Sequence, residues 1–315
     1  MAAVTATEQR AIELNAVRKQ RSLWADAGYR LRRNRASMTG LFIIIATALV
    51  AIAAPLLAPY DPIQQNTSIA LSDPAWTQNQ YVAAGHPFGT DALGRDTLSR
   101  LIYGARVSML VGLVPTCLVF TIGISIGMLS GFNGGWVDNL LMRFTDIVYA
   151  FPDLLFLIII VGTLRDTGFG NLLGGLVLIF AALAVVNWVG LARLVRGQVL
   201  SLKEKEFIEA ARSIGARPSR IMFRHLFPNT LAPIIVSLAF SIPGAILGEA
   251  ALGFLGIGIK PPTPTWGVMI NDGFVVFSAT PWPVFLPAIC ISVVMLSFTF
   301  LGDGLRDALD PRMKH

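Results

Sequence analysis

The feature that most limits the possible folds of this chain is a series of long apolar runs with few charges. A helix needs about 20 apolar residues to cross the roughly 30 Å hydrocarbon core of a bilayer, and several runs are that long. Charged residues make up only 14% of the 315 residues, whereas a soluble domain has about 25%. The sequence therefore predicts an all-α, polytopic membrane protein embedded in a lipid bilayer.

Six apolar runs lie along the chain. We expect transmembrane helices at 41–57, 107–129, 140–161, 172–191, within 231–259 and at 284–301. The third run is the least apolar, because Arg143, Asp146 and Asp153 interrupt it. An even number of spans places both termini on the same side of the membrane.

The distribution of Lys and Arg predicts which side that is. The side that holds the termini and the loop between the fourth and fifth spans carries 20 of the 25 Lys and Arg residues, and the other side carries five. Cytoplasmic segments of membrane proteins are enriched in these residues, so we expect both termini in the cytoplasm. The net charge of +6 follows from this topology, and no nucleic-acid partner is expected.

This topology divides the chain into successive parts. They are a cytoplasmic amino-terminal segment (1–40), a first transmembrane helix (41–58), an extracytoplasmic segment (59–106), a core of five transmembrane helices (107–302) with a cytoplasmic loop at about 194–227, and a cytoplasmic tail (303–315). The three His residues lack metal-ligand spacing and both Cys residues lie in apolar runs, so we expect neither a metal site nor a disulfide framework.

The cytoplasmic loop contains a short predicted helix. Ser201 and Glu204 have the spacing of a capping box at a helix start, and Gly215 has the chemistry of a helix end. Apolar residues recur between them at helical spacing: Phe207, Ile208, Ala211 and Ile214. So short a helix is marginal in water unless it packs on something. Periodicity alone leaves two interpretations open, a helix on lipid headgroups or a helix docked on a soluble partner.

The residues of this loop resemble a known motif. The pattern Glu209-Ala210-Ala211-x3-Gly215, followed after nine residues by HLFP at 225–228, is similar to the EAA motif of ATP-binding-cassette importer permeases. The family pattern is E-A-A-x3-G-x9-I-x-L-P, so His and Phe here replace the family's Ile and Leu. The resemblance implies that this is the coupling helix, which docks on a cytoplasmic ATPase. The residues implied in coupling are Phe207, Ile208, Glu209, Ala210, Ala211, Arg212 and Gly215.

Two more segments resemble the C-type permease subunits of dipeptide, oligopeptide and nickel importers. They are 86–106, which begins HPFGTDALGRD, and 302–311, which reads GDGLRDALDP. The resemblance runs from about Tyr29 to the end of the chain. It implies a type I ABC importer permease fold and, for the whole complex, the uptake of short peptides, with nickel, glutathione or another small solute as alternatives.

The same resemblance implies the partners. These are a second homologous permease subunit, two cytoplasmic ABC ATPase subunits that bind ATP-Mg, and an extracytoplasmic substrate-binding protein, assembled in the bacterial inner membrane. The chain itself has no G-x-x-x-x-G-K-[ST] loop to hold a nucleotide phosphate. We therefore expect a transport subunit that binds no cofactor and is not itself an enzyme.

Ionisable residues at membrane depth are further candidates, because burying a charge is costly. Glu249, in the outer part of the fifth span, has two interpretations: it lines the translocation pathway and meets a peptide's ammonium group, or it forms a salt bridge or a helix-end hydrogen bond, with Arg106 as the candidate partner. The pair is favoured because buried charges usually have partners. Asp153 in the third span has the same two interpretations.

Other interpretations remain for parts of the chain and for its class. The segment 91–106 is either a docking surface for a binding protein or a scaffold against the bundle. The glycines at 123, 127 and 131 are interpreted as a stripe of small residues that lets helices pack closely. An ion-coupled secondary transporter would usually show an internal repeat and more carboxylates in the membrane. A membrane-embedded enzyme would need a catalytic constellation, and the sequence shows neither pattern.

Overall fold

The computed structural model of the protein describes residues 23–77 and 81–310. Within these residues the regular structure is helical, and the one β-bridge is an isolated pair between Thr90 and Asp96. The α-helices are α2 (Leu23–Arg33), α3 (Arg35–Ile52), α4 (Ala54–Leu57), α5 (Thr97–Asn133), α6 (Gly135–Tyr149), α7 (Asp153–Leu164), α8 (Leu176–Lys203), α9 (Glu206–Ser213), α10 (Pro218–Arg220), α11 (Phe227–Phe254), α12 (Trp266–Phe274) and α13 (Trp282–Leu309).

Five helical segments are long and apolar enough to span a membrane. They are Arg35–Ile52, Thr97–Asn133, Leu172–Lys203, Pro218–Phe254 and Trp282–Leu309. The bent pair α6 and α7 forms a sixth span if its two halves are counted together. The all-α membrane fold predicted from the apolar runs is confirmed.

The second and third predicted spans differ from the observed helices. The second span, expected to start at 107, begins at Thr97, because the side chain of Asp96 accepts a hydrogen bond from the Ser99 amide and caps the helix there. The third span, expected as one helix at 140–161, breaks between α6 and α7 with a bend of 82°. Pro152 causes the break, since a proline has no amide hydrogen and disfavours helical geometry in the residue before it.

Close packing of α5 on α8 forms the centre of the molecule. A Cβ atom on Gly127 would lie 2.7 Å from Cβ of Val195, and one on Gly131 would lie 2.9 Å from Cβ of Val199. Gly123 approaches α8 equally closely. These glycines are the predicted small-residue stripe, and the structure confirms that they let two long helices approach.

The segment that joins α4 to α5 is held by a network of ion pairs. Arg95 bonds Asp91 at 2.6 Å and Asp272 of α12 at 2.9 Å. Arg100 pairs with the same two carboxylates, and Asp91, Arg95 and Arg100 are buried. For these residues of the 91–106 segment, the scaffold interpretation agrees with the structure.

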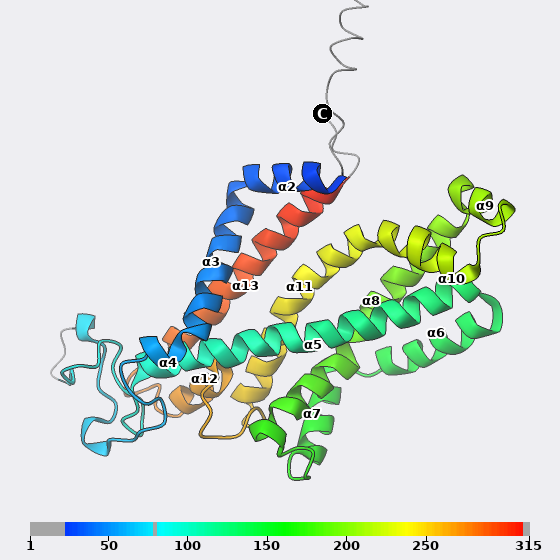
Figure 1. Ribbon diagram of the computed structural model, residues 1–315. Helices are drawn as coiled ribbons and strands as arrows, with labels where there is room; N and C mark the ends of the chain where they lie inside the picture. The colour runs from blue at the N-terminus through cyan, green and yellow to red at the C-terminus, as the bar shows by residue number, and fades with distance from the viewer. Residues whose placement is uncertain (1–22, 78–80, 311–315) are drawn as a thin grey trace, which may run out of the picture.

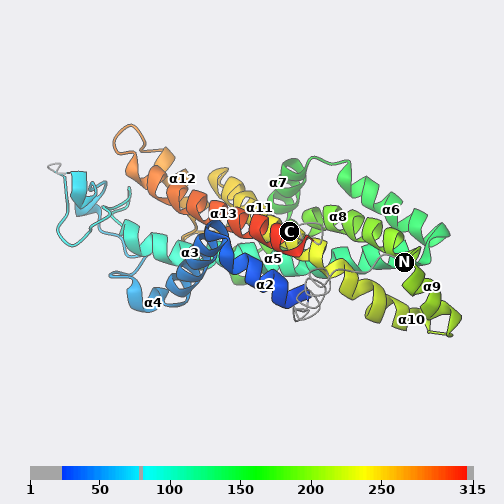
Figure 2. The ribbon, with the colours of Figure 1, turned by 90° about the horizontal axis from the view of Figure 1, so that it is seen from above.

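The molecule is elongated, with the segment between α4 and α5 at one end and α9 at the other (Figures 1 and 2). Helices α3 and α13 lie side by side, and α2 lies across their ends (Figure 1). Helix α5 begins directly after this segment and packs along α8, whose far end leads to α9.

Candidate functional site

Helix α9 and the connection that carries it form the first candidate site. The predicted capping box is wrong, because α8 continues through Ser201 to Lys203 and α9 begins only at Glu206. Tertiary packing explains the longer helix: Val199 is buried against Gly131 of α5. The residue before α9 makes no side-chain cap.

The end of α9 agrees with the prediction. Gly215 has φ +75°, in the left-handed region that favours glycine. Its amide bonds the Arg212 carbonyl at 2.9 Å, and the Ala216 amide bonds the Ala211 carbonyl at 3.0 Å. These two bonds form a Schellman motif, which satisfies carbonyls that the helix end leaves free.

The predicted apolar stripe of α9 divides into two parts. Ile208 and Ala211 are buried in a cluster with Ile221 and Leu226, and they anchor α9 to the base of α11. The other two residues of the stripe, Phe207 and Ile214, are exposed. Together with three exposed neighbours they form what we call the outer face of α9: Phe207, Glu209, Ala210, Arg212 and Ile214. Ile214 is 85% exposed, so this face leaves apolar side chains uncovered.

Ion pairs that were not predicted brace the helices beneath α9. Arg196 of α8 donates two hydrogen bonds to the carboxylate of Asp138 on α6, at 2.6 and 2.7 Å. Ser130 of α5 also donates to this carboxylate. Asp146 pairs with Arg193 of α8 at 2.7 Å and not with its helix neighbour Arg143. The partners are far apart in the sequence, so periodicity does not reveal them.

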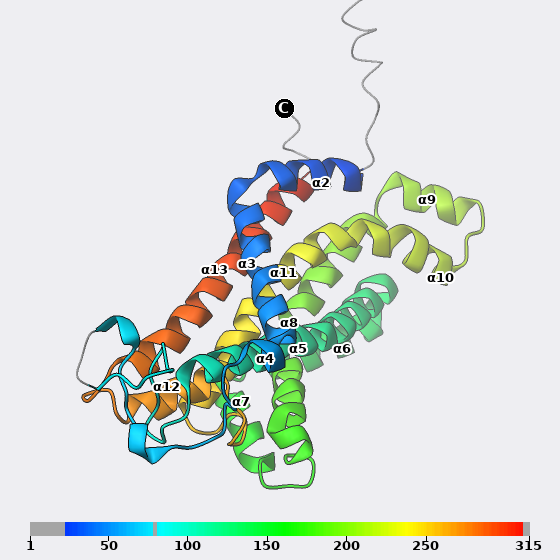
Figure 3. The same ribbon diagram turned by 60° about the vertical axis from the view of Figure 1, so that its left-hand side comes forward.

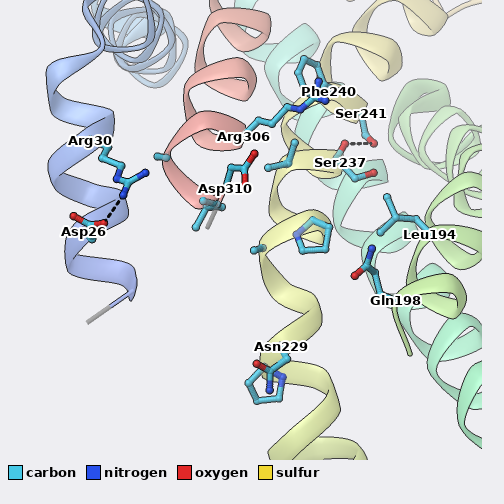
Figure 4. Close-up of a pocket in the computed structure, with 16 residues that line it drawn as sticks. Asp26, Arg30, Leu194, Gln198, Asn229, Ser237, Phe240, Ser241, Arg306 and Asp310 are labelled. Carbon is cyan, nitrogen blue, oxygen red and sulfur yellow. Dashed lines mark hydrogen bonds and ion pairs between the residues drawn. The ribbon is translucent and has the colours of Figure 1, made fainter. Parts of the chain in front are cut away.

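A cavity between two groups of helices is the second candidate site. It measures about 920 Å³ and lies between α2 and α13 on one side and α8 and α11 on the other (Figure 4). Its polar lining includes residues from all four helices: Asp26, Arg30, Gln198, Asn229, Ser237, Ser241, Arg306 and Asp310. On α11, Asn229, Pro233, Ser237 and Ser241 recur every four residues and so share one face.

The predicted pathway residues do not line this cavity. Glu249 is fully buried, and no residue of 23–77 or 81–310 forms an ion pair or hydrogen bond with its oxygens. The side chain of Thr265 lies beside the carboxyl group but outside hydrogen-bonding geometry. Asp153 is exposed in the first turn of α7.

The predicted pair between Glu249 and Arg106 does not form. Gly104 and Gly112 of α5 face α12 and α11, respectively. Arg106 is two residues beyond Gly104, which turns it about 200° around the helix axis, and its side chain is exposed. The pairing prediction is wrong because sequence does not reveal how α5 is rotated.

Comparison with known proteins identifies the family. The model for the binding-protein-dependent transport system inner membrane component matches residues 123–315. The model for the N-terminal transmembrane domain of oligopeptide transport permease C matches residues 22–74. Together the two models cover both groups of helices around the cavity.

Relatives align with the chain over most of its length. The dipeptide transport system permease protein DppC of Bacillus subtilis is 41% identical over 290 residues, which cover 92% of this chain and 86% of that protein. The oligopeptide transport system permease protein OppC of Escherichia coli is 40% identical over 292 residues, covering 93% and 92%.

A solved structure supports the fold. A chain of the MetNI methionine ABC transporter in an inward-facing conformation superimposes with a TM-score of 0.53 at 18% identity, covering 68% of this chain and 97% of that one. This similarity concerns the fold alone. With the family match and the relatives, it shows that the chain belongs to the family of binding-protein-dependent transport system inner membrane components, as a permease subunit of an ABC importer.

Proposed function

We propose that this permease forms half of the translocation pathway of an ATP-driven importer of short peptides, and that α9 transmits the action of the ATPase. The observation that carries the coupling role is the arrangement of α9. Its inner side is anchored through Ile208 and Ala211, whereas its outer face exposes apolar and charged residues. The peptide substrate is inferred from the names of the DppC and OppC relatives.

The family works with ATPase and substrate-binding partners. For this chain we propose a second homologous permease, two ATPase subunits that bind ATP-Mg, and a binding protein on the extracytoplasmic side, in a bacterial inner membrane. Both termini and α9 lie in the cytoplasm in this proposal. The excess of Lys and Arg on that side of the predicted topology supports it.

The cavity supports a position for the pathway. Ser237 and Ser241 place hydroxyl groups on the face of α11 that lines the cavity, and Gln198 of α8 adds an amide. Polar side chains at membrane depth usually face a water-filled space or a bundle interior. We therefore assign the pathway to this face of α11 in place of Glu249, Arg106 and Asp153.

The coupling role can be tested by substituting residues of α9 while the anchoring residues Ile208 and Ala211 are left unchanged. We expect Glu209→Lys to reduce ATP-dependent peptide uptake by tenfold or more, because it reverses a charge on the outer face while Ile208 and Ala211 stay buried. Gly215→Pro should have the same effect, since proline cannot adopt the observed φ of +75°. Uptake is measured in vesicles that contain the complete transporter.

The matched control is Glu204→Lys, which makes the same charge change on an exposed residue outside α9. The control should keep uptake, and all three variants should insert into the membrane in equal amounts. Normal uptake by Glu209→Lys would contradict the coupling role. The substrate is tested separately by mass spectrometry of what the purified binding protein carries, and nickel or glutathione there would contradict the peptide assignment.

A further inference from the structure

The corner between α2 and α3 is a fixed part of the fold. Asn34 separates the two helices and caps α3, since its side chain accepts a hydrogen bond from the Ser37 amide at 3.2 Å. The Ser37 hydroxyl bonds the Phe300 carbonyl of α13 at 2.9 Å. A Cβ atom on Gly40 would lie only 2.5 Å from the Ser297 carbonyl oxygen. Helix α3 is therefore fixed on α13, and α2 lies across their ends (Figure 3).

Three arginines at this corner are exposed. They are Arg32, Arg33 and Arg35, and none of them forms an ion pair within the described ranges. The guanidinium of Arg33 lies over the ring of Tyr29, 4.7 Å from its centre, which leaves the N–H groups at the guanidinium edge available. Three exposed positive charges within four consecutive residues attract an anion to this corner.

An exposed apolar stripe on α3 continues from these arginines. Its residues recur at intervals of four and three, the spacing of one helix face: Met38, Phe42, Ile45, Leu49 and Ile52. Arg35 is three residues before Met38 and lies on the same face. The stripe is about 21 Å long at 1.5 Å per residue, longer than one leaflet of the hydrocarbon core. Only 17% of this span is buried in the chain, against 28–50% for the other four spans.

We propose that this corner is a binding site for an anionic phospholipid. The phosphate accepts hydrogen bonds from Arg32, Arg33 and Arg35, and the acyl chains lie along the apolar stripe of α3. Guanidinium groups suit this ligand because they bind phosphate oxygens through paired N–H donors. Charge at one end and apolar surface along the next 21 Å or so match the two parts of a phospholipid.

The test measures lipid selectivity of the full chain. The protein is purified in mild detergent, mixed with equal amounts of phosphatidylglycerol and phosphatidylcholine, and the lipids that remain bound are counted by native mass spectrometry. We expect a preference for phosphatidylglycerol. The variant R32Q/R33Q/R35Q should reduce that preference by tenfold or more, since each basic residue near an anionic membrane contributes about a fivefold effect.

The matched control is R217Q/R220Q/R224Q, which removes three exposed charges from the connection between α9 and α11. This control should keep the preference. Equal loss in both variants would overturn the proposal, because total charge would then explain the binding. Wild-type protein without any preference would also overturn it.

A second variant separates binding from folding. R32K/R33K/R35K keeps the charges but lacks the paired N–H donors, so it should keep the wild-type melting temperature and retain more of the preference than R32Q/R33Q/R35Q does. A third measurement tests the stripe: a photoreactive group on the acyl chain of phosphatidylglycerol should label peptides from α3. Labelling absent from α3, with a second permease chain cross-linked there in its place, would show that another helix covers the stripe and would contradict the lipid site.

Discussion

At the scale of single residues, the surroundings of Glu249 are the most unusual in the described part of the chain. Gly112 of α5 packs against Ile246, one turn before Glu249, and Gly267 packs against Ala250, one residue after it. The carboxyl group is thus enclosed by α5 and α12 as well as its own helix. An unpaired charge in such a place would lack the hydrogen bonds and ion pairs that usually compensate burial.

Because the carboxyl group is enclosed, we expect two substitutions of Glu249 to differ in their effect on stability. Glu249→Gln keeps the size of the side chain and is neutral, so the melting temperature should change by about 2 °C or less. Glu249→Lys adds volume and a positive charge, and it should destabilise the fold by roughly 3 kcal/mol or more. Thermal unfolding of the purified chain distinguishes them. Equal destabilisation by Gln and Lys would mean that the carboxylate charge itself is required.

The residues that sequence could predict are those whose role is local. Gly215 could be identified because a helix end and its left-handed glycine involve only a few consecutive residues. The pair between Asp138 and Arg196 could not, since 58 residues separate them. The predicted pair of Glu249 with Arg106 failed for a related reason, because it depends on the rotation of two distant helices.

At the scale of elements, the glycines of α5 and α8 allow a matched comparison. Gly127 has no room for a Cβ atom, which would lie 2.6 Å from the Ala192 carbonyl oxygen, whereas nothing lies within 4 Å of such an atom at Gly190. Both residues are in helix interiors, where alanine is intrinsically favoured over glycine by about 1 kcal/mol. The difference between the two sites therefore isolates helix packing.

We expect Gly127→Ala to lower the melting temperature of the isolated chain by several degrees, because α5 and α8 must move apart. Gly190→Ala should leave it unchanged or raise it slightly. Circular dichroism during heating in detergent measures both. If the two substitutions had the same effect, the small-residue contact would not limit how closely the helices pack.

Helix boundaries were harder to predict than the helices themselves. Hydropathy identifies where a chain can cross a membrane, but it does not predict how far a helix continues beyond the apolar run. Helix α5 starts at Thr97 because of a polar cap, and α8 continues to Lys203 because Val199 packs against Gly131. Pro152 alone favours a helix break. Hydropathy did not predict the break, because apolar residues lie on both sides of Pro152.

At the scale of the whole molecule, the helices form two groups that converge where α11 and α13 pack together near α12. One group contains α2, α3 and α13, and the other contains α8, α9 and α11 (Figure 1). The cavity of about 920 Å³ lies between them. If α9 moves with its ATPase, the second group moves relative to the first, and the cavity is the space whose size changes.

This arrangement predicts water in the cavity of the resting transporter. In a chain whose Cys117 and Cys290 are replaced by Ser, Ser237→Cys should react with a charged, membrane-impermeant thiol reagent added from the side of α9. Phe300→Cys is the matched control. It lies at a similar depth, since Gly302 packs against Phe240, but it is exposed on the outside of α13 and should face lipid.

The expected result is a reaction at residue 237 at least ten times faster than at residue 300, because thiols react as thiolates and hydrocarbon excludes both charged species. Adding the ATPase subunits with a non-hydrolysable ATP analogue should slow the reaction if ATP binding closes the cavity on this side. Equal rates at the two positions would place the water-filled pathway elsewhere. A fast reaction at residue 237 that ATP binding leaves unchanged would separate the cavity from the movement of α9.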